Sequence, residues 1–179
     1  MKKAIISYSL TGNNEVLATS LAAALDAEHL RITEPRHRTM LTIMLDMILG
    51  RTPPVEFPPL ETEKYDLVLF VGPIWMGQIA TPLRGCFEQL RSIIGKYIFI
   101  SISGGADGPN PKIAAELERR LKNKPITIID LHIADLLPSE PKPRRSDTST
   151  YRINGKDTRG LTEKAVTILK RVISDKKDF

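Results

Sequence analysis

A short polar segment near the N-terminus carries many of the groups in this chain that can bind a ligand. Ser9-Leu10-Thr11-Gly12-Asn13-Asn14 offers hydroxyl and amide groups, a flexible glycine and the first N–H groups of a helix expected to begin at Asn13. A helix N-terminus binds an anion such as phosphate without a lysine, because its first N–H groups are unpaired and its end is partly positive. The segment lacks the Lys of a nucleotide P-loop, which argues against ATP or GTP hydrolysis. Phosphate binding and simple capping of the helix by Thr11 or Asn13 both stay open.

Two further segments of unusual composition each follow a strongly apolar run. Gly72-Pro73-Ile74-Trp75-Met76-Gly77-Gln78 contains the only tryptophan of the chain, on which a planar aromatic ligand can stack. Ser103-Gly104-Gly105-Ala106-Asp107-Gly108 is rich in glycine and lacks bulky side chains, so a flat ring can lie against its backbone. The alternatives are core packing for Trp75 and an ordinary turn for the glycine-rich segment.

The elements that must position these segments alternate between strand and helix. Short apolar runs predict strands at 4–8, 29–33, 66–71, 97–102 and 126–131, and helical spacing predicts helices from Asn13 and over 40–48, 81–94, 111–122 and 161–174. This alternation predicts an α/β fold, a three-layer doubly wound sheet of five parallel strands in one domain over residues 1–179. Ligands of such a sheet bind beyond the carboxyl ends of the strands, where all three segments are expected.

Residues 135–160 differ from the rest of the chain, because prolines, basic residues and a run of hydroxyl residues follow the last predicted strand. We expect a long basic insertion there. Loops of this length are usually functional or mobile, so covering the sheet edge and docking a partner are both open.

Composition excludes several classes of function. The net charge of +5 is spread among acidic residues without aromatic-basic alternation, so we expect no nucleic-acid binding. Cys86 is the only cysteine and is expected to be packed within a helix, and His29, His37 and His132 are scattered, so neither a disulfide nor a metal centre is expected. No apolar run approaches the roughly 18 residues that span a bilayer, which favours a cytoplasmic protein without membrane insertion. Redox chemistry would therefore require a bound cofactor.

The three segments together resemble the flavodoxin family, over roughly residues 1 to 130. The resemblance implies strand order 2-1-3-4-5 and an FMN cofactor at the point where the connections reverse. It implies that the FMN phosphate is held by Ser9, Thr11, Gly12, Asn13 and Asn14. It further implies that the isoalloxazine ring lies between one group formed by Pro73, Ile74, Trp75, Met76 and Gly77, and another formed by Ser103, Gly104, Gly105 and Asp107.

The sequence departs from the family pattern at three points. Asn14 stands where a threonine is usual, the third segment has no aromatic residue to cover the ring, and the chain is basic where flavodoxins are usually acidic. Negative charge at Asp107 is expected to disfavour the anionic reduced flavin.

Three functions follow from the resemblance. The first is electron transfer by FMN with a redox partner protein, for which no side chain need act as acid, base or nucleophile. The second is an NAD(P)H-dependent quinone or flavin reductase that uses FMN, with a small quinone or flavin substrate. Its pocket would be formed by the helix over 40–48 and the insertion over 135–160, within one chain or across a homodimer. The third is a flavodoxin-like scaffold that has lost FMN. Stable semiquinone without turnover would favour the first, and rapid NAD(P)H oxidation with a quinone the second.

Overall fold

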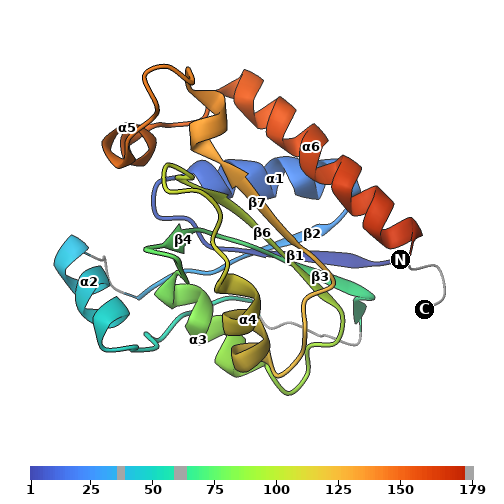
Figure 1. Ribbon diagram of the computed structural model, residues 1–179. Helices are drawn as coiled ribbons and strands as arrows, with labels where there is room; N and C mark the ends of the chain where they lie inside the picture. The colour runs from blue at the N-terminus through green and yellow to red at the C-terminus, as the bar shows by residue number, and fades with distance from the viewer. Residues whose placement is uncertain (36–38, 59–63, 176–179) are drawn as a thin grey trace.

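A parallel sheet forms the centre of the computed structural model, which describes residues 1–35, 39–58 and 64–175. Its five strands are β1 (Lys3–Ser7), β2 (Glu28–Arg31), β3 (Leu67–Val71), β6 (Tyr97–Ser103) and β7 (Ile128–His132). All neighbours are parallel and the order is β2-β1-β3-β6-β7 (Figure 1). Counting only the strands of this sheet, the order is 2-1-3-4-5, which confirms the prediction.

Helices cover both faces of the sheet, as an all-parallel sheet requires. Figure 1 shows α1 (Asn13–Leu25) and α6 (Gly155–Ser174) on one face, with α3 (Thr81–Leu90) and α4 (Ile113–Leu121) on the other. The remaining helices are α2 (Met40–Ile48), which contacts α3, and the short α5 (Arg145–Thr150). Among the described residues, no helix has the length and apolar character needed to cross a bilayer.

Alternate residues of the central strands form two separate cores. Phe70 of β3 packs edge-to-face against Phe87 of α3 and Tyr97 of β6 under the α3 and α4 layer. Leu69 and Ile98 face the opposite way, toward α1 and α6. Every residue of β3 is buried, which agrees with the continuously apolar run that predicted this strand.

The end of the chain differs from the prediction. The predicted start of the last helix at Leu161 is wrong, because α6 begins at Gly155. Asn154 caps it by accepting from the N–H groups of Lys156 and Asp157, and the Asp157 side chain accepts from the Asn154 N–H in return. The stretch 135–160 therefore contains α5, the beginning of α6 and the second half of a 3₁₀ turn, η2 (Ile133–Leu136).

Other predicted boundaries shift by a few residues. The helix predicted to reach Ile94 ends at Leu90 and continues as a turn, and the strand predicted from Ile126 begins at Ile128. The predicted α2 range of 40–48 is confirmed. Residues 51–58, which lead from α2 toward β3, form no helix or strand, and Glu56 makes a single bridge to Thr33.

Candidate functional site

The first loop, residues 8–12 between β1 and α1, leaves the start of α1 open to a ligand. Gly12 is the residue before the helix and has φ 93°, a conformation that favours glycine. No side chain of the described residues caps this helix, so the interpretation of Thr11 or Asn13 as a simple cap is wrong. A Cβ atom on Gly12 would meet nothing within 4 Å, which shows open space beside the unpaired N–H groups of the first turn.

The side chains of Asn13 and Asn14 are engaged within the protein. Asn14 donates from Nδ2 to the Ile102 carbonyl (3.1 Å) and accepts at Oδ1 from the Ile102 N–H (2.8 Å). Asn13 forms the same kind of pair with the Tyr151 carbonyl (3.0 Å) and the Ile153 N–H (3.2 Å). The groups that these two residues can offer to an anion are therefore their backbone N–H groups.

The second loop, after β3, folds into a small hairpin. Strands β4 (Ile74–Trp75) and β5 (Gln78–Ile79) pair antiparallel, and Met76 (φ 49°) and Gly77 (φ 73°) form the turn between them. Two consecutive positive φ angles are the signature of a type I′ hairpin turn. Met76 is 66% exposed, whereas the half-buried ring of Trp75 packs edge-on against Tyr8 at 6.0 Å. The hairpin thus presents its turn to solvent and the Trp75 ring to Tyr8 of the first loop.

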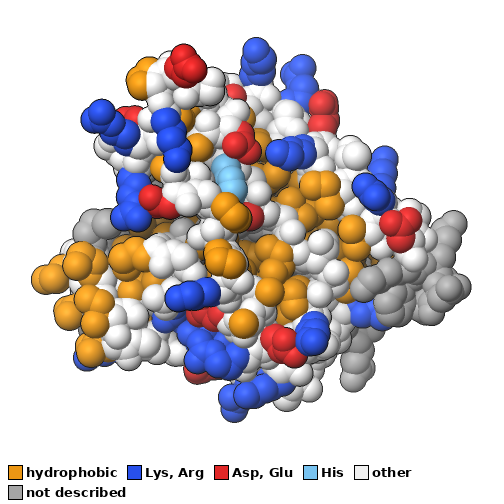
Figure 2. Space-filling model, viewed as in Figure 1, with side chains coloured by type: hydrophobic (Ala, Val, Ile, Leu, Met, Phe, Trp, Pro, Cys, Tyr) orange, Lys and Arg blue, Asp and Glu red, His pale blue; other side chains and the backbone are white. Residues whose placement is uncertain are grey.

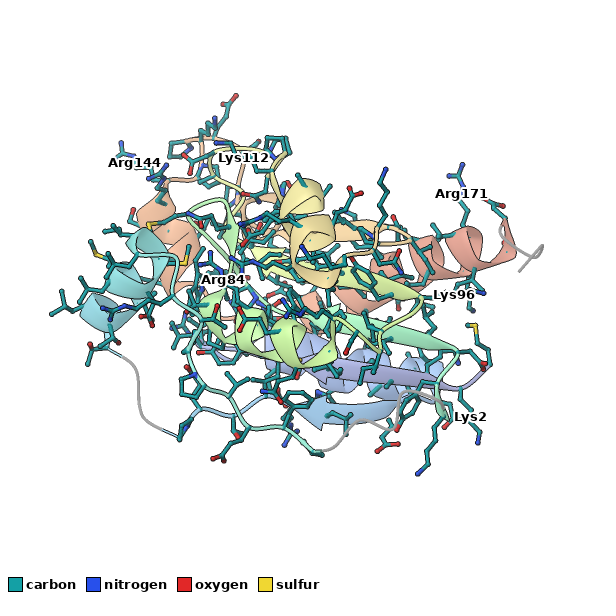
Figure 3. The ribbon with its side chains drawn as sticks, turned by 90° about the horizontal axis from the view of Figure 1, so that it is seen from below. Lys2, Arg84, Lys96, Lys112, Arg144 and Arg171 are labelled. Atoms are coloured by element: carbon teal, nitrogen blue, oxygen red, sulfur yellow. The ribbon has the colours of Figure 1, made fainter. Side chains whose placement is uncertain are left out.

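A buried ion pair holds the base of this hairpin. Arg84 of α3 is 1% exposed and donates to the Ile79 carbonyl (3.1 Å) and to Gln78 Oε1 (2.8 Å). Glu116 of α4 accepts from the Ile79 N–H (2.9 Å) and pairs with both Arg84 (3.4 Å) and Arg120 (2.8 Å). Figure 3 shows the labelled Arg84 inside the molecule, in contrast to Lys2 and Arg171 at its periphery. Burial lowers the pKa of Arg84, with Arg120 acting in the same direction and Glu116 opposing it.

The third loop, residues 104–108 after β6, packs closely on its neighbours. Gly105 has φ 72°, and a Cβ atom there would lie 2.4 Å from Cβ of His132, so only glycine fits. Asp107 forms an ion pair with Arg145 of α5 (2.7 Å), and this hydrogen bond raises the pKa of Arg145. The negative charge expected at Asp107 is thus partly offset by a cation.

The three loops leave adjacent strands at one edge of the sheet, because β3 lies between β1 and β6. The Tyr8 N–H donates to the Val71 carbonyl (3.0 Å), and the Gly72 N–H donates to the Ile100 carbonyl (3.0 Å), so pairing continues to where the loops depart. The hairpin turn extends to the segment after the third loop, with Asn110 Oδ1 3.9 Å from where a Cβ of Gly77 would be.

Comparison with known proteins identifies this architecture. No protein-family model and no curated protein matches the chain. Among solved structures, a flavoprotein in complex with FMN from Lactobacillus acidophilus is similar at TM-score 0.62 and 22% identity, over 73% of this chain and 93% of that one. The apo form of that flavoprotein gives 0.59 and 21% over 75% and 94%, and a flavodoxin from the domain Archaea gives 0.51 and 12% over 96% and 99%. The chain has a flavodoxin-like fold.

In this flavodoxin-like fold, residues from the stretch 135–160 contact both the first and the third loop. Asn13, the α1 residue that directly follows the first loop, holds Tyr151 and Ile153, as described above. On the other side, Thr148 Oγ1 of α5 would lie 3.0 Å from a Cβ on Gly104. The stretch therefore packs against the candidate site.

Three polar residues beside the flavodoxin-like site were missed as functional candidates, namely Asn110, Asp130 and Ser101. His132 was noted only as a scattered histidine. Asn110 donates to Asp130 Oδ2 (2.7 Å), which also lies 3.2 Å from His132 Nε2. The available signal was the spacing of Asp130 and His132, which interrupts an apolar strand at alternate positions near its carboxyl end.

The remaining candidates lie elsewhere in the flavodoxin-like fold. Cys86 is buried in α3, as predicted, and burial raises its thiol pKa. His29 Nε2 lies 2.8 Å from Ser7 Oγ, and His37 lies outside the described residues. A cavity of about 570 Å³ beside the edge strand β2 contains none of the predicted site residues, and it is lined by His29, Arg31, Thr33, Glu56, Phe57 and Pro58.

Proposed function

We propose that the chain binds FMN across its three loops and transfers electrons between redox partners. The observation that carries the proposal is the first turn of α1, whose backbone N–H groups lie beside open space at Gly12. The side-chain amides of Asn13 and Asn14 do not fill this space, because they are hydrogen-bonded to Tyr151 and Ile102. Such a turn fits a phosphate group without a cationic side chain. The FMN complex of the similar Lactobacillus flavoprotein supports FMN as the phosphate ligand.

The second and third loops supply the residues that would contact the flavin ring. Pro73, Ile74, Trp75, Met76 and Gly77 of the hairpin would contact one side of the ring, and Ser103, Gly104, Gly105 and Asp107 the other. Ser9 and Thr11 would add their hydroxyl groups at the phosphate. FMN supplies the electron chemistry when bound, and the protein binds it, orients it and sets the charge around it.

The first test is an FMN titration of the purified protein, followed by flavin absorbance and fluorescence. We expect saturable binding that Thr11→Ala weakens roughly tenfold, as loss of one hydrogen bond to a charged phosphate predicts. Thr19→Ala is the matched control, because Thr19 is an exposed residue two turns further along α1. Absence of binding at micromolar FMN would overturn the cofactor and leave the scaffold function in its place.

Trp75→Ala tests the ring contacts separately from the phosphate. Loss of the indole should shift the visible absorption bands of bound FMN more than Thr11→Ala does, since the bands report on the ring environment. Anaerobic photoreduction of the wild-type protein then tests electron transfer, for which we expect stable one-electron reduced flavin.

A second function, an FMN-dependent NAD(P)H reductase of quinones or flavins, is favoured by the surface of α2. Figure 2 shows hydrophobic side chains gathered over this helix at the left of the view. The exposed ones are Leu41, Met44, Leu45, Ile48 and, just beyond the helix, Leu49. Because Arg84 contacts both Met47 of α2 and Gln78 of the hairpin, this apolar surface adjoins the proposed ring site. Rapid NAD(P)H oxidation with a quinone would favour the reductase over the electron carrier.

A further inference from the structure

Four polar side chains lie together at the carboxyl ends of β6 and β7. The strand register pairs Ser101 with Asp130 and Ser103 with His132. Side chains alternate along a strand, so these four share the face of Tyr97 and Phe99, which is covered by α3 and α4. Ser101 is fully buried and Ser103 is 5% exposed.

The hydrogen bonds of this cluster are incomplete. Asp130 Oδ2 accepts from Asn110, but Asp130 Oδ1 and the two serine hydroxyls are buried and have no partner among the described residues. Buried polar groups are nearly always paired with protein or with water. A cluster that served only to hold the strands together would satisfy these groups within the protein, as Asn14 does with Ile102. The unpaired oxygens therefore indicate a hydrated polar site.

His132 lies between this cluster and the third loop. Its Nε2 atom is buried and lies 3.2 Å from Asp130 Oδ2, although not aligned for a hydrogen bond. Its Nδ1 atom would be 3.0 Å from a Cβ on Gly105, so this nitrogen is close to the loop backbone. A carboxylate oxygen near Nε2 favours a proton on that nitrogen. The ring then gains or loses its second proton at Nδ1, on the side of the third loop.

We propose that Asp130 and His132 form a proton-binding pair behind the third loop, and that His132 becomes protonated when the flavin at this site is reduced. The inference rests on the proposed function. An electron comes from a one-electron donor, and a proton passes from water to Nδ1 of His132, so the neutral imidazole becomes a cation. Nε2 keeps its proton and Asp130 stays ionised. The positive charge on His132 would lie on one side of the third loop and the negative charge of the reduced flavin on the other. Each charge would stabilise the other.

The other charged groups around His132 are paired with one another or exposed to solvent. His132 is therefore the group that would take up a proton when the flavin is reduced. On the loop side, Asp107 is paired with Arg145 of α5. On the α4 side, Glu116 is paired with Arg84 and Arg120, and Lys112 precedes the helix. Asp135 in η2 is exposed to solvent. Asp130 is the carboxylate in direct contact with the imidazole.

The test is an NMR titration of ¹⁵N-histidine-labelled protein in three states: without FMN, with oxidised FMN and with dithionite-reduced FMN under argon. His132→Gln assigns the resonance by its absence. At a fixed pH, we expect the ¹⁵N shift of His132 Nδ1 to move toward that of a protonated ring nitrogen between the oxidised and reduced complexes, because added negative charge nearby favours the cation. Asp130→Asn should move the ring shifts of His132 toward those of the neutral imidazole in every state, including the protein without FMN.

A second readout is the reduction potential of bound FMN between pH 6 and 8. His132→Gln should remove part of the pH dependence of this potential, whereas His29→Gln, on the opposite face of the sheet, should leave it unchanged. Bound FMN with an unchanged His132 titration on reduction would overturn this inference alone. Failure of FMN to bind would overturn the proposed function and the inference with it.

Discussion

Buried polar groups beside the first loop and the hairpin are paired within the protein, whereas several of those behind the third loop are not. Asn14 fills both hydrogen-bonding positions of Ile102, and Arg84 has Glu116, Gln78 and Ile79 as partners. Ser101 and Ser103 are as deeply buried, yet their hydroxyls have no partner among residues 1–35, 39–58 and 64–175. The two sets of groups are alike in burial and polar character, and what distinguishes them is whether their hydrogen bonds are made within the protein.

The largest effect on stability is expected for the buried ion pair of Arg84 and Glu116, because these paired groups are charged. Glu116→Gln keeps the shape of the side chain but leaves the buried Arg84 without its closest counter-charge. We expect the free energy of unfolding to fall by about 3 kcal/mol, because breaking a buried ion pair on one side leaves an uncompensated charge. Urea unfolding followed by fluorescence of Trp75 measures this and reports on the hairpin.

Glu118→Gln is the matched control for this substitution. Glu118 lies on the same helix, is 50% exposed and pairs with Lys124 only at 3.8 Å. Its loss should change the free energy of unfolding by less than about 0.5 kcal/mol, as for exposed ion pairs in general. Equal effects of the two substitutions would contradict a structural role for the buried pair.

Asn14→Ala should produce the next largest effect. It leaves the N–H and carbonyl of Ile102 buried without the partners that they have now. We expect a loss of about 2 kcal/mol in the free energy of unfolding, since each unsatisfied buried group costs on the order of 1–3 kcal/mol and nearby water recovers part of this. Thr11→Ala in the loop before α1 should leave stability within about 0.5 kcal/mol, because Thr11 is exposed.

Ser101→Ala tests the unpaired side of the comparison. The hydroxyl has no partner among the described residues, and water bound to it can rearrange when it is removed, so the substitution should leave stability within about 0.5 kcal/mol or raise it slightly. Thermal and urea unfolding measure the change. A loss above about 1.5 kcal/mol would mean that the hydroxyl is satisfied in solution by a tightly held group, and the contrast with Asn14 would no longer hold.

The sequence allowed the sheet to be predicted because its signals are local. The apolar runs at 66–71 and 97–102 are buried on both faces, and their alternation with helices leaves few topologies. The strand order came from the family resemblance carried by the loop motifs. The start of α6 was missed because Asn154 caps a first turn without an apolar periodicity. Strands and helix ends are therefore predictable from sequence only where residues close together in the chain carry the signal.

The candidate site was less predictable because its contacts connect distant parts of the chain. Asn13 and Tyr151 are 138 positions apart, and nothing in either local sequence indicates that they meet. Asn14 departs from the family pattern, and its bonds to Ile102 give it a structural role that the loop sequence alone did not reveal. Arg84 and its partner Glu116 likewise meet only because the fold packs α3 against α4.

The smallest expected effect concerns His29, which lies behind the first loop and contacts Ser7. Burial lowers its pKa from 6.5, and Glu15 opposes this. The unfolded chain then binds more protons than the folded one just below pH 6.5, so folding stability falls as the pH decreases through that range. His29→Gln should reduce this dependence by roughly a few tenths of a kcal/mol, because solvent screens the partly exposed ring. Urea unfolding at pH 7.5 and 5.5 compares the two proteins, and an equal change in both would contradict the lowered pKa of His29, because it would show that folding leaves proton binding at this residue unchanged.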